Sequence, residues 1–570
     1  MLVERLRLSL TAVDYITFLI CLSGVFDLFR FPTSLVLLLA GLATSQGATA
    51  QAAPEPGAIE RTIPTQMRQS VAGPAVAVPT RKGDSQSGGR KKFTLGAVNI
   101  DGSTVFSQAE LSRYFEAYLA TEVDQDRLAQ IAQEITARYR KSGYLLSYAS
   151  LPQQNIEAGM VRLSVVEGRI DKISVQGAGS AQGAIEAMAA PLLKGGPVTM
   201  GALERTIGLI RDFPGYSVTD ISVMRSGTAD GPHTLKVTLV PDRFRTFTYA
   251  DNRGVGSLGH SRIFNSFAIS SLAVQGDELR VDLFAMPGGR TRYLYGQVSA
   301  ATPLGRQGLR LMVSGSRGDQ YLRADEGFKG QADNISAQLS YPFLRARKLT
   351  LIGKTSLTDW RSVGSQAGAR RLRDRLRVGR LGVEFSTEGK TRLQGEFALS
   401  RGFGFGGMTE RGDPLASRQD ASGRFTKAAL SMQATRPLDD RLTFRAVAMA
   451  QYSDRPLLSA EEFSLGGNRL GRAFDFNAGT GDRGAGAGAE LGYRLGKDNA
   501  RLGVELFGFV DAGVARDLKS DLAPGVTRRL ASTGLGSRFT VAGTTLAVEA
   551  GVPLKGQGKP RLFVSAFRAF

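Results

Sequence analysis

Apolar and polar residues alternate along many short segments from about residue 244 to the last residue, Phe570, and turns rich in Gly, Asp and Arg separate these segments. In Leu442 to Tyr452 one parity is apolar throughout, and in Gly503 to Asp511 the acidic residues share one face while valine and leucine share the other. A period of two predicts strands with one apolar and one polar face. Such strands form a closed barrel in a membrane, because hydrocarbon offers backbone groups no partner and a closed ring leaves none unpaired. A soluble β-sandwich alternates in the same way, so the pattern by itself leaves that fold open.

Residues 93–168 predict a small α+β module in the order strand, helix, helix, strand, strand. Its second helix has apolar residues at helical spacing and lies between Asp124, a suitable N-cap, and Gly143, which favours a helix end. The apolar positions of that helix are Leu128, Ile131, Ile135 and Tyr139. After the opening strand the predicted elements are the helices Gln108 to Leu119 and Gln125 to Lys141 and the strands Tyr144 to Leu151 and Met160 to Val166.

Residues 169–242 repeat this order of elements. The predicted strands and helices are Lys172 to Val175, a helix near Ala184 to Leu193, the helix Leu203 to Arg211, and the strands Tyr216 to Met224 and Thr234 to Val240. Two copies of one βααββ module therefore precede the alternating strands.

The first 52 residues predict an export signal. Leu35 to Ala43 is an apolar core preceded by Arg30, and Ala50-Gln51-Ala52 offers the small-x-small pattern of a cleavage site, so we expect cleavage after Ala52. Neither this core nor the earlier run Tyr15 to Phe26 reaches the roughly 20 residues of a spanning helix, so a permanent anchor is less favoured.

A linker is predicted between the leader and the first module. Residues 53–92 are rich in Pro, Gln, Ser and Gly and end in a basic cluster. A short helix around Ile59 to Gln69 would be weakened by Pro64. We treat this stretch as an N-terminal plug helix and linker.

The chain has 72 Lys and Arg against 52 Asp and Glu, a formal net charge of +20. A basic balance can indicate nucleic-acid binding, but these arginines are scattered singly and do not gather with aromatic residues on one face. We therefore interpret them as lumen and loop charges and expect no nucleic-acid partner.

Residues that could carry catalysis or bind a metal are few. The single cysteine, Cys21, lies in the predicted leader, and the two histidines, His233 and His260, lie in different predicted domains. Neither histidine has the neighbours that a zinc site or a Ser-His-Asp arrangement requires, and no Gly-rich loop precedes Lys and Ser or Thr. We expect no enzyme activity, no metal and no cofactor.

Several motifs follow one another in order between Phe93 and Phe570. They are Tyr144 to Gln154 with Val161 to Ile170, Leu203-Glu204-Arg205 with Asp212-Phe213-Pro214-Gly215, and, in the strands, Asp251-Asn252-Arg253-Gly254, Gly276-Asp277-Glu278-Leu279, Tyr341-Pro342-Phe343-Leu344-Arg345 and Phe509-Val510-Asp511-Ala512-Gly513. These motifs resemble the POTRA (polypeptide-transport-associated) domains and the barrel of two-partner secretion transporters, the haemolysin-activator family. The resemblance implies a barrel of 16 antiparallel strands over 243–570 in the outer membrane of a Gram-negative bacterium, preceded by two periplasmic POTRA domains, 93–168 and 169–242.

The most specific motif is Leu465 to Phe474, which resembles the Val-Arg-Gly-Phe/Tyr tip that the family carries on a long extracellular loop folded into the lumen. Arg472 and Phe474 match, whereas Gly471 stands in place of Val and Ala473 in place of Gly. Alanine tolerates positive φ poorly, so the backbone shape of the tip is in question. In the family the loop arginine pairs with an aspartate on an inward-facing strand, and Asp511 occupies the matching place. Such a pair would either serve transport or only brace the barrel.

The resemblance implies a function in protein secretion. The POTRA pair would recognise an unfolded exported protein, and the barrel would pass it to the cell surface. We expect the cargo to bind along Tyr216 to Met224 and the neighbouring helix by adding a strand to the sheet. Outer-membrane lipid and the barrel-assembly machinery are further expected partners, since the final strand, Arg561 to Phe570, ends in an aromatic residue that resembles the assembly signal of outer-membrane proteins. A factor that inserts other barrels and a passive porin remain alternatives.

Overall fold

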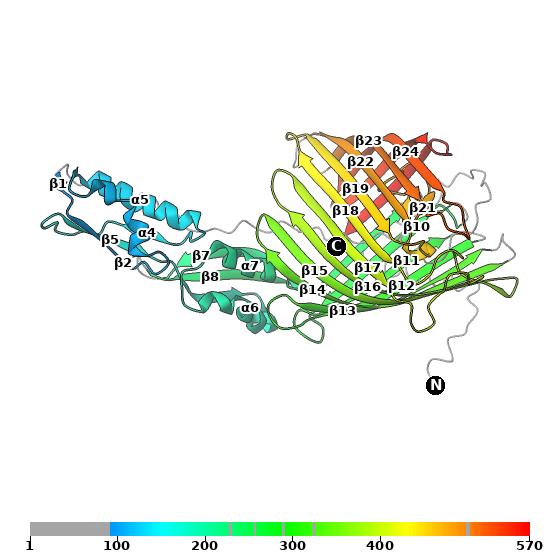
Figure 1. Cartoon of the computed structure of the whole chain (residues 1–570), viewed down its shortest axis with the longest axis horizontal. Helices are drawn as coiled ribbons and strands as arrows, with labels where there is room; N and C mark the ends of the chain where they lie inside the picture. Colours follow the sequence, from blue (N-terminus) through cyan, green and yellow to red (C-terminus); the bar gives the residue numbers. More distant parts are fainter. Residues whose placement is uncertain (1–91, 227–230, 256–257, 288–290, 323–326, 497–501) are drawn as a thin grey trace.

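The computed structural model describes residues 92–570 except 227–230, 256–257, 288–290, 323–326 and 497–501. Two α+β modules lie at one end of a β-barrel (Figure 1). The predicted leader, Cys21 and the predicted plug helix and linker lie outside the described residues. In the part of the chain that is described, no helix is long and apolar enough to span a bilayer.

The first module has a three-stranded sheet in the order β2-β5-β4, with β2 and β5 parallel and β4 and β5 antiparallel. The bounds of its elements are β1 (Phe93–Thr94), β2 (Ala97–Asp101), α4 (Gln108–Ser112), η1 (Glu116–Tyr118), β3 (Glu122–Val123), α5 (Gln125–Lys141), β4 (Tyr148–Ser150) and β5 (Met160–Val166). Helix α5 has the predicted bounds. Its N-cap Asp124 accepts a hydrogen bond from the backbone N–H of Arg127, and its four predicted apolar residues are buried.

Two predicted elements of this module are shorter than expected. The first helix ends at Ser112, because the following carbonyls form i→i+3 bonds that bring Phe115 into the core. The strand predicted from Tyr144 begins only at Tyr148, because the N–H of Tyr144 bonds to the carbonyl of Tyr139 and the N–H of Ser147 bonds to that of Tyr144. Residues 144–147 therefore form the turn that follows helix α5.

The second module repeats the arrangement, with a sheet in the order β6-β8-β7. Its elements are β6 (Ile170–Gln176), η2 (Gly179–Ala181), α6 (Gln182–Ala189), η3 (Ala190–Leu193), α7 (Met200–Arg211), β7 (Gly215–Arg225) and β8 (His233–Asp242). Strand β7 lies at an edge and pairs only with β8 among the described strands. Apolar residues of both helices and all three strands form one buried core.

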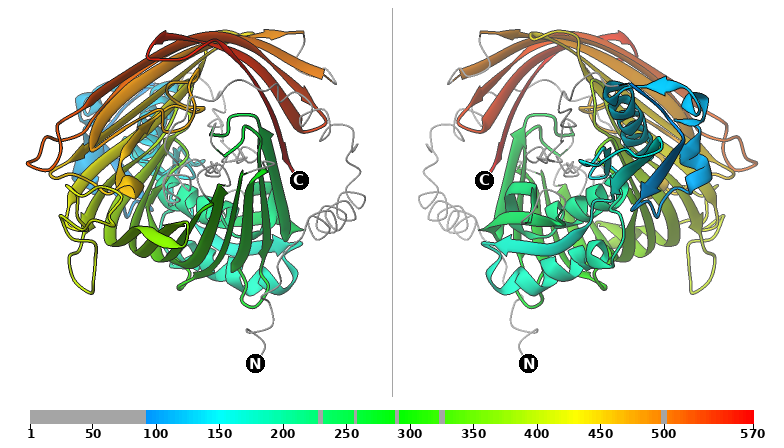
Figure 2. Two further views of the ribbon diagram at one scale, coloured as in Figure 1. Left: turned by 90° about the vertical axis from the view of Figure 1, so that its right-hand side faces the viewer. Right: turned by 90° about the vertical axis from the view of Figure 1, so that its left-hand side faces the viewer.

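Sixteen antiparallel strands close into the barrel, which confirms the predicted fold (Figure 2). The ring closes where β26 pairs with β9, and Ser565 of β26 lies opposite Asp251 of β9. The strands are β9 (Phe244–Asp251), β10 (Arg262–Ser270), β11 (Glu278–Pro287), β12 (Thr291–Pro303), β13 (Arg310–Leu322), β14 (Phe328–Arg345), β15 (Leu349–Gln366), β16 (Ala369–Thr387), β17 (Arg392–Gly402), β18 (Thr426–Pro437), β19 (Leu442–Ser453), β22 (Arg483–Leu495), β23 (Leu502–Arg516), β24 (Thr527–Val541), β25 (Thr544–Lys555) and β26 (Arg561–Ala569).

The alternation along the strands separates an apolar outer face from a polar inner face. On β23, Leu506 and Val510 are exposed on the outside, whereas Phe507, Phe509 and Asp511 are buried inside. The predicted parity is therefore confirmed. A ring with lipid on its outer face and polar groups within satisfies its backbone hydrogen bonds between strands.

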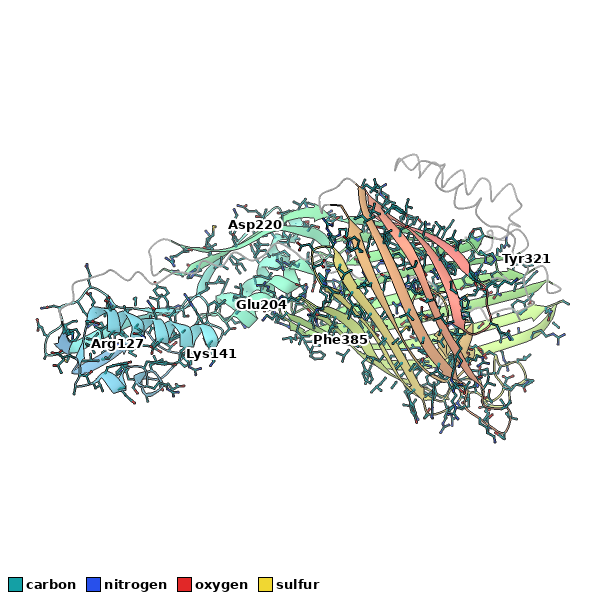
Figure 3. All side chains as sticks on the ribbon, turned by 90° about the horizontal axis from the view of Figure 1, so that it is seen from above. Arg127, Lys141, Glu204, Asp220, Tyr321 and Phe385 are labelled. Carbon is teal, nitrogen blue, oxygen red and sulfur yellow. The ribbon has the colours of Figure 1, made fainter. Side chains whose placement is uncertain are left out.

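The second module is fastened to the barrel at the turn between β14 and β15. Arg345 donates two hydrogen bonds to the carboxylate of Asp212, at 2.8 and 3.1 Å. Arg205 of α7 donates to the carbonyl of Pro342 at 2.7 Å and to the hydroxyl of Tyr341 at 3.0 Å. These contacts place α7 against the module-side end of the barrel (Figure 3).

Candidate functional site in the barrel lumen

The connection between β19 and β22 folds back into the barrel. It contains the short helix η4 (Ser459–Glu461) and a hairpin of two strands, β20 (Phe463–Leu465) and β21 (Gly479–Gly481). The hairpin packs on the inner face of β22, β23 and β24. Its buried apolar side chains form a cluster with the barrel wall: Phe463, Leu465, Leu470, Ala473, Phe474, Ala515 and Leu530. We call residues 454–482 the lumen loop.

Glycines on the inner wall make room for the lumen loop. A Cβ at Gly484 would lie 2.0 Å from the ring of Phe463, and one at Gly486 would lie 2.7 Å from Leu470. On the next strand, a Cβ at Gly513 would lie 2.5 Å from Leu465. The Gly-Ala alternation at the start of β22 thus presents a bare backbone to the loop and methyl groups to the outside, which allows close approach.

The tip of the lumen loop is held by its backbone. The carboxylate of Asp511 accepts hydrogen bonds from the N–H of Gly471 at 2.5 Å and the N–H of Arg472 at 3.3 Å, and also from the hydroxyl of Ser532 at 2.8 Å. Gly471 has a φ of +72°, a conformation that suits glycine. Ala473 is not among the residues with positive φ, so the replacement of glycine there does not strain the tip.

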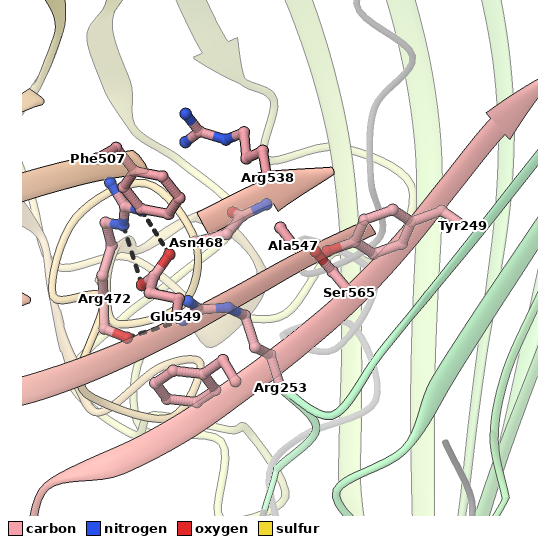
Figure 4. Close-up of a pocket in the computed structure, with 10 residues that line it drawn as sticks. Tyr249, Arg253, Asn468, Arg472, Phe507, Arg538, Ala547, Glu549 and Ser565 are labelled. Carbon is pink, nitrogen blue, oxygen red and sulfur yellow. Dashed lines mark hydrogen bonds and ion pairs between the residues drawn. The ribbon is translucent and has the colours of Figure 1, made fainter. Parts of the chain in front are cut away.

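The guanidinium of Arg472 lies between two glutamates, Glu490 and Glu549, and Figure 4 shows its contact with Glu549. Its Nη1 donates to Oε2 of Glu490 at 2.8 Å, its Nε donates to Oε1 of Glu549 at 3.2 Å, and its Nη2 bonds to the other oxygen of Glu549. The guanidinium carbon also lies 3.7 Å from the centre of the Phe509 ring. Only 12% of the Arg472 side chain is exposed, so the arginine is largely withdrawn from water but fully paired.

A second arginine, Arg253, binds the same tip and lies just after β9, the first strand of the barrel. Arg253 donates to the carbonyl of Arg472 at 2.7 Å and to Oε1 of Glu549 at 2.6 Å. Arg538 of β24 bonds to Glu490 at 2.8 Å and Arg445 of β19 at 3.2 Å, so Glu490 is shared by three arginines and Glu549 by two. The lumen loop is therefore bound through its main chain and through one side chain at once.

The expected ion pair between the side chains of Arg472 and Asp511 is not formed. The two residues lie together, but Asp511 binds backbone N–H groups of the tip while the guanidinium reaches past it to Glu490 and Glu549. Phe474, the fourth residue of the expected tip, is buried against the turn between β25 and β26, where a Cβ at Gly556 would lie 3.0 Å from its ring.

Comparison with known proteins finds matches to the first module and to most of the barrel. The sequence model of the family described as haemolysin secretion/activation protein ShlB/FhaC/HecB matches residues 235–539, and the model of the ShlB-type POTRA domain matches residues 93–168. The chain belongs to the haemolysin secretion/activation protein family. It is an outer-membrane β-barrel transporter of two-partner secretion, and its partner is a secreted protein.

Characterised relatives of this transporter are distant in sequence but similar in extent. The outer membrane transporter CdiB of Dickeya dadantii is 24% identical over 448 residues, which are 75% of this chain and 77% of CdiB. The heme/hemopexin transporter protein HuxB of Haemophilus influenzae is 24% identical over 535 residues, which are 88% of this chain and 92% of HuxB. The solved structure of CdiB from Escherichia coli has the same fold, with a TM-score of 0.71 and 19% identity over 90% of this chain and 95% of that one.

The family assignment orients the transporter in the membrane. The modules are POTRA domains in the periplasm, so the turn at Arg345 is periplasmic and the lumen loop enters from the extracellular end. In the described residues no group of three or more histidine, cysteine or acidic side chains could hold a metal ion. His233 is buried in the second POTRA domain, and His260 lies near Arg561 at the barrel seam.

Sequence reasoning missed Glu490, Glu549 and Arg253 as members of the site. Arg253 lies in the Asp251-Asn252-Arg253-Gly254 motif, but its target is far away in the sequence. The two glutamates occupy inward positions of otherwise apolar and glycine-rich strands, and such a charge at an inward position is the signal that could have identified them.

Proposed function

We propose that the POTRA pair captures an unfolded secreted protein in the periplasm and that displacement of the lumen loop opens its path through the barrel. Capture would use the edge of β7, which pairs with β8 on one side only among the described strands. An extended segment of cargo can add to such an edge through main-chain hydrogen bonds. Thr219 and Asp220 are exposed along β7, and Figure 3 shows Asp220 on the outer side of the second domain.

The observation that carries the proposal is the way the lumen loop is fastened. Its tip is bound by Asp511 through two backbone N–H groups and by Glu490 and Glu549 through Arg472. Each of these bonds joins the loop to the wall and none lies within the loop itself, so they can break together and leave both surfaces intact. Charged partners of this kind re-form readily in a wet lumen, which suits a closure that opens for each cargo chain.

Secretion by an Arg472→Ala variant tests the proposal. We expect the barrel to assemble normally and the amount of partner protein in the medium to fall, because a tip that keeps only its backbone bonds to Asp511 no longer returns to one defined closed position from which cargo displaces it. Arg469→Ala is the matched control. Arg469 lies on the same loop, and its described hydrogen bond goes to a serine hydroxyl, Ser431, and not to a carboxylate. Normal secretion by Arg472→Ala would refute the role of the loop.

The remaining assignments complete the proposal. We propose the division into a leader (1–52), a plug helix and linker (53–92), POTRA domains (93–168 and 169–242) and a barrel (243–570). The barrel-assembly machinery would recognise Phe570. Outer-membrane lipid would surround the apolar outer face of the barrel. The transporter would act without enzyme activity, with cargo folding outside the cell as the driving force. Family membership favours secretion over insertion of other barrels or passive diffusion.

A further inference from the structure

The outer surface of strands β13 to β17 changes from apolar to charged along one line around the barrel. On the periplasmic side of this line the outward residues are apolar and exposed: Val313, Ile335, Leu357, Leu381, Phe397 and Leu399. On its extracellular side most outward residues are charged: Arg317, Asp319, Asp333, Asp359, Arg361, Arg373, Arg375, Arg377 and Arg401. Across the strands Arg317, Asp333, Arg361 and Arg375 form one continuous row.

The charged residues point out of the barrel and not into it. Residues of the other parity on the same strands, Trp360, Leu376 and Val378, are buried in a cluster with Phe425 inside the barrel. The described register of β15 and β16 is unbroken from Leu349 to Gly364, so the two parities keep to their faces over this stretch.

The line lies at the expected height of the outer-leaflet headgroups. Strand β16 ends at the periplasmic side with Thr387, and Arg377 precedes it by ten residues (387 − 377). Ten residues of a tilted strand span about 25 Å, which matches the apolar band of an outer-membrane barrel. Figure 3 shows Phe385 of β16 near the POTRA end of the barrel and Tyr321 of β13 at the opposite end.

Positive charge exceeds negative charge at the centre of this surface. Asp359 is the carboxylate shared by three arginines: Arg377 lies 2.7 Å away, Arg361 3.5 Å and Arg375 4.0 Å. The Nε of Arg375 is buried and has no hydrogen-bond acceptor. One carboxylate cannot neutralise three guanidinium groups, so the cluster of Arg361, Arg375 and Arg377 has donors left for an anion.

An exposed aromatic side chain lies beside the cluster. Phe405, in the loop after β17, is 60% exposed, and the guanidinium of Arg377 lies 5.2 Å from its ring centre. Aromatic residues are enriched where membrane hydrocarbon meets headgroups. The apolar belt below and the cationic cluster with its aromatic neighbour above fit a ligand that has acyl chains and anionic groups.

We propose that Arg361, Arg375 and Arg377 bind the phosphate groups of a phosphorylated glycolipid in the outer leaflet, with its acyl chains on the apolar residues of the periplasmic side and Phe405 beside Arg377. Guanidinium groups bind phosphate oxygens through paired N–H donors, and arginines at a membrane surface attract anionic lipid groups. The site rests on the outer-membrane location of the barrel and is independent of the identity of the cargo and of the motion of the lumen loop.

Lipid binding by the full-length protein in detergent tests this site. The probes are bisphosphorylated lipid A and the same lipid A after removal of both phosphates, with bound lipid counted by native mass spectrometry. The Arg361→Gln/Arg375→Gln/Arg377→Gln variant should bind the bisphosphorylated lipid at least about 10-fold more weakly, since each arginine near a membrane surface contributes substantially to anion binding. Lys390→Gln/Arg392→Gln/Arg436→Gln, which removes three exposed charges near the periplasmic end, should bind like the native protein.

Two further variants keep the test decisive. Asp359→Asn removes the shared carboxylate and should bind the phosphorylated lipid more tightly than the native protein. If the triple variant does not fold, Arg361→Gln serves in its place, because that side chain is 57% exposed. Unchanged binding of the bisphosphorylated lipid by the folded arginine variant would overturn the proposal, as would an equal loss for the dephosphorylated lipid.

Discussion

The backbone N–H of Gly471 donates a hydrogen bond of 2.5 Å to Oδ1 of Asp511, so the aspartate on strand β23 holds the main chain of the lumen loop. The other oxygen accepts from the hydroxyl of Ser532 and from the N–H of Arg472. A carboxylate can receive all three donors because it only accepts hydrogen bonds. The arginine side chain is then free to bind two other carboxylates.

Substitution of Asp511 distinguishes this arrangement from a direct ion pair with Arg472. Asp511→Asn keeps one acceptor oxygen for Gly471 but turns an N–H₂ group toward the N–H of Arg472. Asp511→Ala leaves both N–H groups without a partner, a loss on the order of 1–3 kcal/mol for each buried donor. We expect secretion to fall in both variants and to fall further with alanine. Equal defects would contradict the arrangement and favour charge as the property that matters.

The glycines on the inner face of β22 lead to a prediction about the side-chain size that this face tolerates. Gly484→Val would place methyl groups where the ring of Phe463 lies, and overpacking of this kind costs about 1–3 kcal/mol. The lumen loop should then lie less firmly on the wall, and single-channel recordings should show more frequent openings. Ala485→Val is the control, because Ala485 is the next residue and faces outward. Identical recordings for the two variants would show that the contact at Gly484 does not hold the loop.

The first POTRA domain is predicted to lose stability in acid through Glu167. Burial alone would raise the pKa of Glu167, but hydrogen bonds from the side chain and backbone of Thr104, the backbone of Val105 and the hydroxyl of Tyr139 outweigh it and lower the pKa below its ordinary value of 4.5. Because the pKa is lowered in the folded state, the stabilisation is complete above 4.5 and is lost as the pH falls through the folded-state pKa.

Hydrogen exchange in this domain of the full-length protein measures the effect. Glu167→Gln should weaken protection around Thr104 by about 1 kcal/mol at pH 7. The native protein and the variant should converge as the pH falls below 4.5. A difference between them that is independent of pH would contradict the ionised role of Glu167.

The alternation of residues was enough to predict the barrel, because lipid outside and water inside impose a period of two on every strand. Helix α5 was predicted to the residue because a cap, a helical apolar stripe and a terminal glycine all agree. The first helix was predicted too long because the i→i+3 turn that buries Phe115 depends on packing and has no local signal. The contacts of the lumen loop were also missed. Glu490 and Glu549 contact Arg472 only after the barrel has closed and the loop has folded back into it. Contacts between residues so far apart in the sequence cannot be predicted from the local spacing of residues.

A disulfide across the tip tests the central claim that the lumen loop must leave the wall for cargo to pass. A Cβ at Gly551 would lie 3.2 Å from that of Ala473, so the two backbones need to separate only slightly to reach the spacing of about 3.5–4.5 Å in a disulfide. In an Ala473→Cys/Gly551→Cys variant, with Cys21 replaced by Ser, partner protein in the medium is measured under oxidising conditions and after reduction. Our account predicts secretion that stops when the bond is formed and returns when it is reduced. Equal secretion by the oxidised and reduced proteins would contradict it.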